Sequence, residues 1–322
     1  MKAMQIVSFD GAEGMRYQEA PLPEPSAGQV SIDAQYSGVG YIEALLAEGF
    51  LQRELPWTPG LEVAGTIREV GPGVTGLEPG QVVAALIMGG GGYGQVVVTG
   101  ADLVAPLPDG LDPALASVVP ANTTTALIAL EHVAHMRAGE HVLVHAAAGG
   151  LGSQMGQVAR LLGAERVVGV TRSPAKRQAV LDLGYDEAWL PEELDSAEGG
   201  QFDVVADPVS GPGRLRSLDL LRVGGRLLAL GDAARGGDQL INSTSLWLRG
   251  AGVIGFNLGA LTAADPALVG QYLRRAVGLV ASGEVGIHIS ERAPIQEAPR
   301  VIAALRQGST IGKTVLVHEP RS

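Results

Sequence analysis

The feature that most constrains the fold is the stretch from His141 to Lys176. An apolar run, His141–Ala146, is typical of a buried parallel strand, and a glycine-rich turn follows it. A helical pattern that ends near Gly163 and a second apolar run, Arg166–Val170, complete a strand–turn–helix–strand unit of the usual size. The sequence therefore predicts an α/β fold with a parallel sheet.

The turn in this unit has the properties of a dinucleotide-binding site of the Rossmann type. Gly149 would let the backbone approach a pyrophosphate, and Gly152 would let the helix pack closely against the strand. The free N–H groups at the helix start, including those of Gly150 and Leu151, would hold the phosphates. Because Ala147 replaces the first glycine of the usual G-x-G-x-x-G pattern, the interpretation depends on the position between strand and helix. A glycine-rich turn of another kind of α/β protein is the alternative.

The end of the second apolar run indicates which dinucleotide binds. In NAD-binding units an acidic residue about 20 residues past the glycines accepts hydrogen bonds from the ribose 2′-hydroxyl. Thr171 stands at that position here, and Arg172, Ser173 and Lys176 follow it. Two cations and two hydroxyls would hold a 2′-phosphate, which a carboxylate would repel. The sequence predicts NADPH, with ordinary solvated residues after a strand as the alternative.

Composition narrows the class of protein. At 322 residues the chain is long enough for two domains, each with its own core. No apolar run approaches the ~20 residues that span a bilayer, and the N-terminus lacks the layout of a signal peptide, so we expect a cytoplasmic protein without a membrane partner. The absence of cysteine excludes disulfides, thiolate catalysis and cysteine zinc sites. A net charge of −11 offers no basic field for nucleic acid.

The pattern along the chain predicts two domains, one of which is split. Residues 1–120 consist of short strands broken by turns, with a helix expected only at Tyr41–Glu48. We expect a β-rich domain from residues 1–120 and 260–322, and a nucleotide-binding domain from residues 121–259. Further elements are expected beyond residue 112, in addition to those of the stretch from His141 to Lys176. The helices are Ala114–Val119, Thr124–His135, Gly213–Leu221, Ala267–Ser282 and Ile295–Gln307. The strands are Phe202–Ala206, Arg226–Leu230, Gly252–Phe256 and Lys313–His318.

Four segments, taken in their order and spacing, resemble those of a known family. They are Pro59–Gly65 (PGLEVAG), Val144–Gly152 (VHAAAGGLG), Gly224–Gly231 (GGRLLALG) and Gly312–Leu316 (GKTVL). The chain resembles the zeta-crystallin-like quinone oxidoreductases, the zinc-independent branch of the medium-chain dehydrogenase/reductase superfamily. The resemblance covers essentially the whole chain. It implies a GroES-like catalytic domain from both chain ends, a Rossmann domain between them and an active site in the cleft.

The resemblance implies further residues around the cofactor. Thr125 matches a threonine near the nicotinamide, although it could equally cap the helix after Asn122. Asp207, just past the end of a strand, is expected to line the pocket. The remaining predicted cofactor residues are Gly231, Phe256, Asn257 and Lys313.

The family's catalytic pattern is altered in this chain. The family commonly reads Gly-Val-Asn-x-x-Asp with a tyrosine shortly after, whereas this chain has Gly40 for the asparagine and Glu43 for the aspartate, and it lacks the tyrosine. Tyr41 is the nearest hydroxyl and is our candidate catalytic residue. Packing in the core is the alternative role for Tyr41.

The resemblance also bears on metal binding. Zinc relatives take ligands at positions that match Gly40, Leu61 and about Ala121. None of these side chains can bind zinc, which requires sulfur, imidazole or carboxylate ligands, so we expect no metal site. Glu62 is interpreted as a buried carboxylate with a structural partner.

Without a metal, the chemistry has to suit an acceptor that needs little Lewis-acid help. Quinones and α,β-unsaturated carbonyls qualify, because conjugation spreads the charge that arrives with hydride, and the protein would supply orientation and water exclusion. We therefore expect an NADPH-dependent reductase of a small-molecule quinone or enone. An enoyl-thioester or tailoring reductase and a nucleotide-binding protein without turnover are the alternatives. The resemblance and the apolar edge strand Gly252–Phe256 favour a homodimer.

Overall fold

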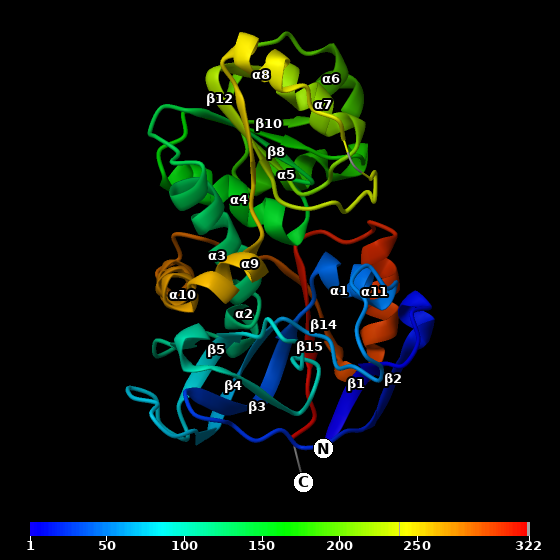
Figure 1. The fold of residues 1–322 in the computed structure, drawn as a ribbon, viewed down its shortest axis with the longest axis vertical. Coiled ribbons are helices and arrows are strands. Elements are labelled where there is room, and N and C mark those ends of the chain that lie inside the picture. Colours follow the sequence, from blue (N-terminus) through cyan, green and yellow to red (C-terminus); the bar gives the residue numbers. More distant parts are fainter. Residues whose placement is uncertain (238, 321–322) are drawn as a thin grey trace. The chain divides into compact units, whose positions relative to one another are not determined.

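The computed structural model describes residues 1–237 and 239–320, which divide into two compact units. One unit combines Met1–Thr124 with Gly259–Ser322, and the other is Thr125–Leu258 (Figure 1). The first unit is rich in antiparallel strands, whereas strands and helices alternate in the second. This arrangement confirms the predicted α/β fold class.

The second unit is built on a six-stranded sheet in which neighbouring strands are parallel. Its strands are β8 (His141–His145), β9 (Arg166–Val170), β10 (Glu187–Trp189), β11 (Phe202–Asp207), β12 (Leu221–Ala229) and β13 (Gly252–Gly255). They lie in the order β10-β9-β8-β11-β12-β13. Numbered within the unit, this order is 3-2-1-4-5-6, which is typical of doubly wound dinucleotide-binding sheets.

Helices cover both faces of this sheet (Figure 1). Crossovers of the usual right hand place the helices after β8 and β9 on one face and the helix after β11 on the other. The core between these layers contains completely buried Leu143, Val168, Val205 and Leu227. The helices of this unit are α4 (Gly150–Leu161), α5 (Arg177–Asp182), α6 (Pro191–Ser196), α7 (Pro212–Asp219) and α8 (Ser243–Arg249).

The helix predicted at Thr124–His135 differs from the observed elements. It is formed by α3 (Val119–Leu127), which continues as a π-helix, η3 (Ile128–Val133). The N–H group of Ala134 reaches back five residues to the carbonyl of Ala129, at 2.9 Å. The carbonyl of Ala134 accepts a 2.8 Å hydrogen bond from Arg226 of β12. The last turn is therefore fixed by a side chain of the sheet.

Helix α8 was not predicted, because its residues show no clear apolar stripe. It forms through its two ends: the side chain of Asn242 accepts the N–H groups of Thr244 and Ser245 at 2.9 and 3.2 Å. Gly250 ends the helix in the left-handed conformation, with φ of 60°. Local capping thus specifies this helix where periodicity does not.

The first unit is built on a seven-stranded sheet. Its strands are β3 (Gln29–Gly38), β4 (Glu62–Val70), β5 (Val82–Leu86), β6 (Val96–Gly100), β7 (Val104–Pro106), β14 (Ile289–Pro294) and β15 (Lys313–Val317). The order is β14-β15-β3-β4-β5-β7, and β6 also pairs with β3. Since β15 pairs antiparallel with β3, with Val315 opposite Gly38, the end of the chain joins strands formed near its beginning.

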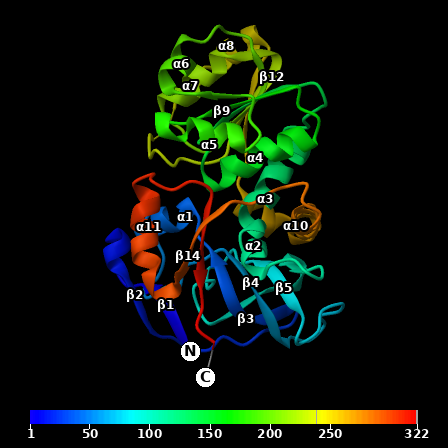
Figure 2. The same ribbon diagram turned by 180° about the vertical axis from the view of Figure 1, so that it is seen from behind.

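The remaining elements of the first unit surround this sheet. A hairpin of β1 (Lys2–Ile6) and β2 (Met15–Glu19) pairs separately. Figure 2 shows α1 (Tyr41–Ala47) and α11 (Ala298–Arg306) side by side, and their buried residues share one core. The other helices are α2 (Pro113–Ala116), α9 (Leu258–Ala264) and α10 (Pro266–Ala281). Within residues 1–237 and 239–320, every helix is too short or too polar to span a membrane.

Candidate functional site

The glycine-rich turn lies where the strand order of the parallel sheet reverses. Strand β8 ends at His145, and α4 begins at Gly150 with Gly149 as its N-cap residue. The connections from β8 and from β11 run outward in opposite directions, so a crevice is expected at the carboxyl end of β8. No side chain in the described part of the chain caps α4. The N–H groups of its first turn are therefore available to an anionic ligand.

The two glycines of the turn have different steric roles. A Cβ atom on Gly152 would lie 2.7 Å from the Cα atom of Ala147 and closer still to the carbonyl oxygen of Ala146. A Cβ atom on Gly149 would meet only the Ala146 oxygen among the described atoms, at 3.2 Å. Close packing of helix on strand therefore requires glycine at residue 152, whereas the chain itself leaves space at residue 149.

A pair of cations follows the end of β9. The buried Thr171 donates its N–H group to the carbonyl of Trp189 at 2.9 Å, and its hydroxyl accepts the N–H group of Ser173 at 3.4 Å. Partial burial lowers the pKa of the Lys176 ammonium, and the nearby charge of Arg172 lowers it further. Arg172 and Lys176 place two positive charges close together, and Thr171 stands where NAD-binding units carry a carboxylate. A bound phosphate would stabilise these two charges.

The residues after β11 are held by a buried carboxylate. Asp207 is fully buried and accepts the N–H groups of Val209 and Ser210 at 2.7 and 2.9 Å. Its other oxygen accepts a 2.6 Å hydrogen bond from Arg214, which also donates to the carbonyl of Gly231 at 2.7 Å. Asp207 thus fixes the backbone beside the crevice, and its side chain faces the protein.

Most of the predicted cofactor residues lie at one edge of the sheet. Parallel strands end at the same edge, so the segments that follow β8, β9, β12 and β13 come together there. The predicted residues in these segments are Gly149, Gly150, Leu151, Gly152, Thr171, Arg172, Ser173, Lys176, Gly231, Phe256 and Asn257. The sheet does not place the other two, because Thr125 lies in α3 and Lys313 begins β15 of the first unit.

Tyr41, the candidate catalytic residue, lies at the start of α1 against a cation. Arg306 of α11 donates a hydrogen bond to the Tyr41 hydroxyl, and its guanidinium lies over the ring, 5.6 Å from the ring centre. The same guanidinium donates to Glu48 at 2.7 Å. Tyr41 is half-buried, so its contacts are those of a surface residue rather than of the core.

Three charged side chains form a buried group in the first unit, which we call the carboxylate–lysine cluster: Glu43, Glu62 and Lys313. Each is about 1–2% exposed. The Lys313 ammonium donates to a Glu62 oxygen at 2.7 Å and to the Val39 carbonyl at 2.8 Å. The second Glu62 oxygen accepts the N–H group of Ala121 at 2.9 Å. The structural partner predicted for Glu62 is confirmed: it is Lys313, which the sequence predicts as a cofactor residue.

The third member of the cluster, Glu43, joins two loops. One of its oxygens accepts the N–H group of Gly40 at 2.8 Å, and the other accepts that of Leu61 at 3.1 Å. Burial raises the pKa of Glu43 to about 7; the charge of Lys313 opposes this shift and that of Glu62 adds to it. Sequence reasoning missed this role, since it interpreted Glu43 only as a replacement for the family's aspartate.

A zinc ion does not fit the residues that the resemblance matches to the ligand positions of zinc relatives, which are Gly40, Leu61 and about Ala121. Gly40, Leu61 and Ala121 have no ligand atom in their side chains, and each donates its backbone N–H group to the cluster instead. Among the residues that the structure describes, no three histidine or carboxylate side chains are grouped to hold a metal ion. The residues present at these positions therefore do not form a zinc site.

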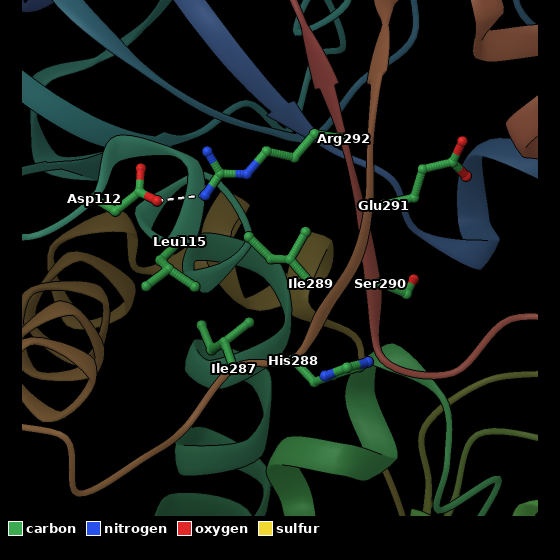
Figure 3. A pocket seen from close by; sticks show the side chains of 8 residues that line it. All are labelled: Asp112, Leu115, Ile287, His288, Ile289, Ser290, Glu291 and Arg292. Atoms are coloured by element: carbon green, nitrogen blue, oxygen red, sulfur yellow. Dashed lines mark hydrogen bonds and ion pairs between the residues drawn. The ribbon is translucent and has the colours of Figure 1, made fainter.

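A shallow pocket of about 420 Å³ lies beside β14, an edge strand of the sheet in the first unit (Figure 3). Leu115 and Ile289 face one side of it together with an ion pair between Arg292 and Asp112. Ser290 points away and donates to the carbonyl of Lys313 at 3.1 Å. None of the predicted site residues lines this pocket, whose lining is Asp112, Leu115 and residues 287–292.

Two protein-family models match the chain. The model described as "Alcohol dehydrogenase GroES-like domain" matches residues 26–109, and the model described as "Zinc-binding dehydrogenase" matches residues 162–316. The first of these matches confirms the predicted GroES-like part of the fold.

Curated relatives fall into two groups. The chain is 32% identical over 272 residues to the quinone oxidoreductase of Rattus norvegicus, covering 81% of this chain and 82% of the rat protein. It is 36% identical over 320 residues to the spectinabilin polyketide synthase system protein NorB of Streptomyces orinoci, covering 94% of this chain. The chain spans 14% of that protein, and 9% and 5% of two other polyketide synthases that it matches.

Solved structures with the same fold cover nearly the whole chain. A mycobacterial protein solved in complex with NADPH has a TM-score of 0.89 and 28% identity, with coverage of 98% of this chain and 99% of that one. A probable oxidoreductase from Mycobacterium abscessus has a TM-score of 0.85 and 31% identity, with coverage of 98% of each chain.

Proposed function

The chain belongs to the zeta-crystallin-like quinone oxidoreductases of the medium-chain dehydrogenase/reductase superfamily, and on this premise we propose that it is an NADPH-dependent reductase of a conjugated carbonyl. The acceptor is a quinone or an α,β-unsaturated carbonyl, and no metal takes part. The observation that carries the proposal is the glycine-rich turn at the reversal point of a 3-2-1-4-5-6 sheet, beside Arg172 and Lys176. The rat quinone oxidoreductase and the NADPH-bound mycobacterial structure support it.

In this proposal each of the two domains predicted from the sequence has its own task. Residues 121–259 bind NADPH: the first turn of α4 holds the pyrophosphate, and Arg172 and Lys176 hold the 2′-phosphate. Residues 1–120 and 260–322 orient the acceptor and exclude water. NADPH supplies the hydride, conjugation in the acceptor takes up the electron pair, and the proton comes from Tyr41 or from solvent. Thr125 stays a predicted cofactor residue, whereas we now propose that Lys313, bonded to Glu62 and to the Val39 carbonyl, serves as the partner of Glu62 and not as a cofactor residue.

Cofactor preference tests the 2′-phosphate site. We expect the double variant Arg172→Ala/Lys176→Ala to lose about 1–2 kcal/mol of NADPH binding, because charged hydrogen bonds at an exposed site are partly screened. NADH binding should stay unchanged, since NADH has no 2′-phosphate. Calorimetry of both cofactors measures this, with Arg177→Ala as the control, because Arg177 is already paired with Glu193. Equal wild-type affinity for NADPH and NADH would contradict the prediction.

Reduction of an acceptor panel tests the reaction and the role of Tyr41. NADPH oxidation should be measured with quinones, enals and enoyl thioesters, for wild type and Tyr41→Phe. A quinone gives a stabilised hydroquinone anion, so quinone reduction should barely change in the variant. If Tyr41 donates the proton to an enolate, enone reduction should slow by ~10²–10⁴-fold. Unchanged rates for both acceptors, with NADPH binding intact, would assign the proton to water.

An enoyl-thioester reductase is the second candidate function. It is favoured by a specific observation: identity to the polyketide synthase protein is 36% over 94% of the chain, against 32% over 81% for the quinone oxidoreductase. The acceptor panel decides between them, since a thioester specialist should show a far higher kcat/KM for enoyl thioesters than for quinones. If wild type reduces no acceptor although it binds NADPH, the remaining alternative is a nucleotide-binding relative without turnover.

We also propose that the chain is a homodimer. Strand β13 forms an open edge of the sheet among the described residues, and exposed apolar side chains lie in the same unit: Val223 is 88%, Trp247 77% and Leu248 73% exposed. Such groups mark interaction surfaces. Light scattering should give twice the chain mass of 33.1 kDa, and Trp247→Glu should reduce it to a single chain. A wild-type mass of one chain in dilute solution would refute the dimer.

A further inference from the structure

The carboxylate–lysine cluster has a geometry that the proposed reaction does not yet use. Its two carboxylates accept backbone N–H groups from three separate segments: Gly40 before α1, Leu61 before β4 and Ala121 in α3. Two carboxylates therefore hold together three chain segments that are far apart in the sequence.

The charges of the cluster explain why it is stable when buried. Glu62 is paired with Lys313 at 2.7 Å, and the ammonium also donates to the Val39 carbonyl at 2.8 Å. A buried ion pair persists when its geometry is good and its other lone pairs and protons are satisfied. Both oxygens of each carboxylate have a partner. The cluster thus contributes a fixed geometry without exposing a charge.

We propose that Glu43, Glu62 and Lys313 are positioning residues of the reductase site, which hold the backbone at Gly40, Leu61 and Ala121. This inference rests on the proposed function. The residues next to the held positions include Tyr41, the candidate proton donor. A displacement of about 1 Å in a group that orients a reactant costs up to ~10²-fold in rate. The cluster therefore acts on the reaction through the backbone.

The first variant separates the two loops that Glu43 joins. Glu43→Gln keeps the shape of the side chain, but an amide has one acceptor oxygen where the carboxylate has two. It can accept the N–H group of Gly40 or of Leu61, and its own NH₂ group faces the other donor. Hydrogen exchange at one of these two amides should accelerate by about tenfold, which corresponds to one lost hydrogen bond, while exchange at Ala121 stays as in wild type.

The second variant removes the ion pair without leaving a buried charge. Lys313→Met alone would leave Glu62 unpaired and prevent folding, so the test uses Lys313→Met/Glu62→Gln. Exchange at Ala121 should accelerate, because the neutral amide oxygen introduced by Glu62→Gln is a weaker acceptor than the carboxylate, and the ion pair no longer holds the side chain in place. The matched control is Glu69→Gln on the same strand, β4, since Glu69 is exposed and its carboxylate is paired with its neighbour Arg68 at 3.3 Å. The control should change neither exchange nor kinetics.

Kinetics on the same proteins complete the experiment. We expect kcat for the best acceptor to fall by ~10–100-fold in both cluster variants, with little change in KM, and NADPH affinity to stay as in wild type. Unchanged exchange at all three amides would overturn the proposal. Accelerated exchange with wild-type kcat would also overturn it, because the cluster would then only stabilise the fold. If wild type reduces no acceptor, the proposed function fails, and the exchange data still show whether the cluster holds these amides.

Discussion

Gly152→Ala is expected to destabilise the nucleotide-binding unit by about 3 kcal/mol, at the upper end of the cost of overpacking. The added Cβ atom would lie 2.7 Å from the Cα atom of Ala147 and closer to the Ala146 carbonyl oxygen. Both contacts are with backbone, which cannot turn away as a flexible side chain does. Either the strand end or the start of α4 has to move, so binding of the proposed NADPH should be lost as well. Urea unfolding and calorimetry measure the two effects.

Gly149→Ala is the matched control, because the two glycines are three residues apart in one turn. Its backbone φ of −82° suits alanine, and its Cβ atom would meet only the Ala146 oxygen, at 3.2 Å. Stability should change by less than ~1 kcal/mol, the cost of a poorer N-cap residue. NADPH binding should nevertheless weaken by about 1–3 kcal/mol, because the methyl group separates the phosphates from their N–H donors. If both variants were equally destabilised, or if Gly149→Ala bound NADPH normally, this division of roles would be wrong.

These two glycines show what kind of information the sequence carries. The strand, turn and helix around residues 149 and 152 are adjacent in the chain, and their periodicities are local properties, so the parallel sheet could be predicted from them. The parallel sheet then placed the other nucleotide segments without further information, since the ends of parallel strands share an edge. The division of the helix after Thr124 into an α-helix and a π-helix was missed. The carbonyl that follows it, that of Ala134, is bonded to Arg226, which lies 92 residues further along the chain.

The carboxylate–lysine cluster was beyond sequence reasoning for the same reason. Glu62 and Lys313 are 251 residues apart, and Glu43 reaches the N–H group of Leu61 across 18 residues. No periodicity connects them, and each is a charged residue that a pattern places at the surface. A partial signal existed: Glu62 lies at the start of the apolar strand β4, so a buried carboxylate with a partner was predicted. Only the tertiary structure shows that the partner is Lys313.

The pH dependence of stability contains opposing contributions from buried groups. Burial lowers the pKa of His318 to about 4, and burial also lowers the pKa of His145. Both histidines bind protons more weakly in the folded state, so their contribution to stability is lost as pH falls below the ordinary histidine pKa of about 6.5. Glu43 has the opposite effect, because its pKa is raised. The free energy of unfolding of wild type can therefore be nearly constant between about pH 4.5 and 6.5, although the contributions of the individual groups change strongly with pH.

Comparison of wild type with Glu43→Gln isolates one of these contributions. The pKa of Glu43 rises from 4.5 to about 7 on folding, so the folded state binds the proton more tightly. The contribution of Glu43 is complete below the unfolded pKa and is lost as pH rises through the folded pKa. At ~1.4 kcal/mol per pKa unit, the loss between about pH 4.5 and pH 8 is about 3 kcal/mol.

Glu43→Gln cannot titrate, so its free energy of unfolding should lack this fall. The difference between variant and wild type should grow in favour of the variant by about 3 kcal/mol from about pH 4.5 to pH 8, whatever constant penalty the lost hydrogen bond adds. Urea unfolding at intervals of pH measures the difference.

The groups that face Glu43 are Lys313, Glu62 and the buried Tyr93. Of these, the Lys313 ammonium opposes the rise in the pKa of Glu43. Lys313→Met/Glu62→Gln removes both charges and leaves burial, the largest cause, so the fall should persist in that variant. Parallel curves for wild type and Glu43→Gln over the whole range would mean that Glu43 binds its proton equally in both states, and that its burial is relieved by water.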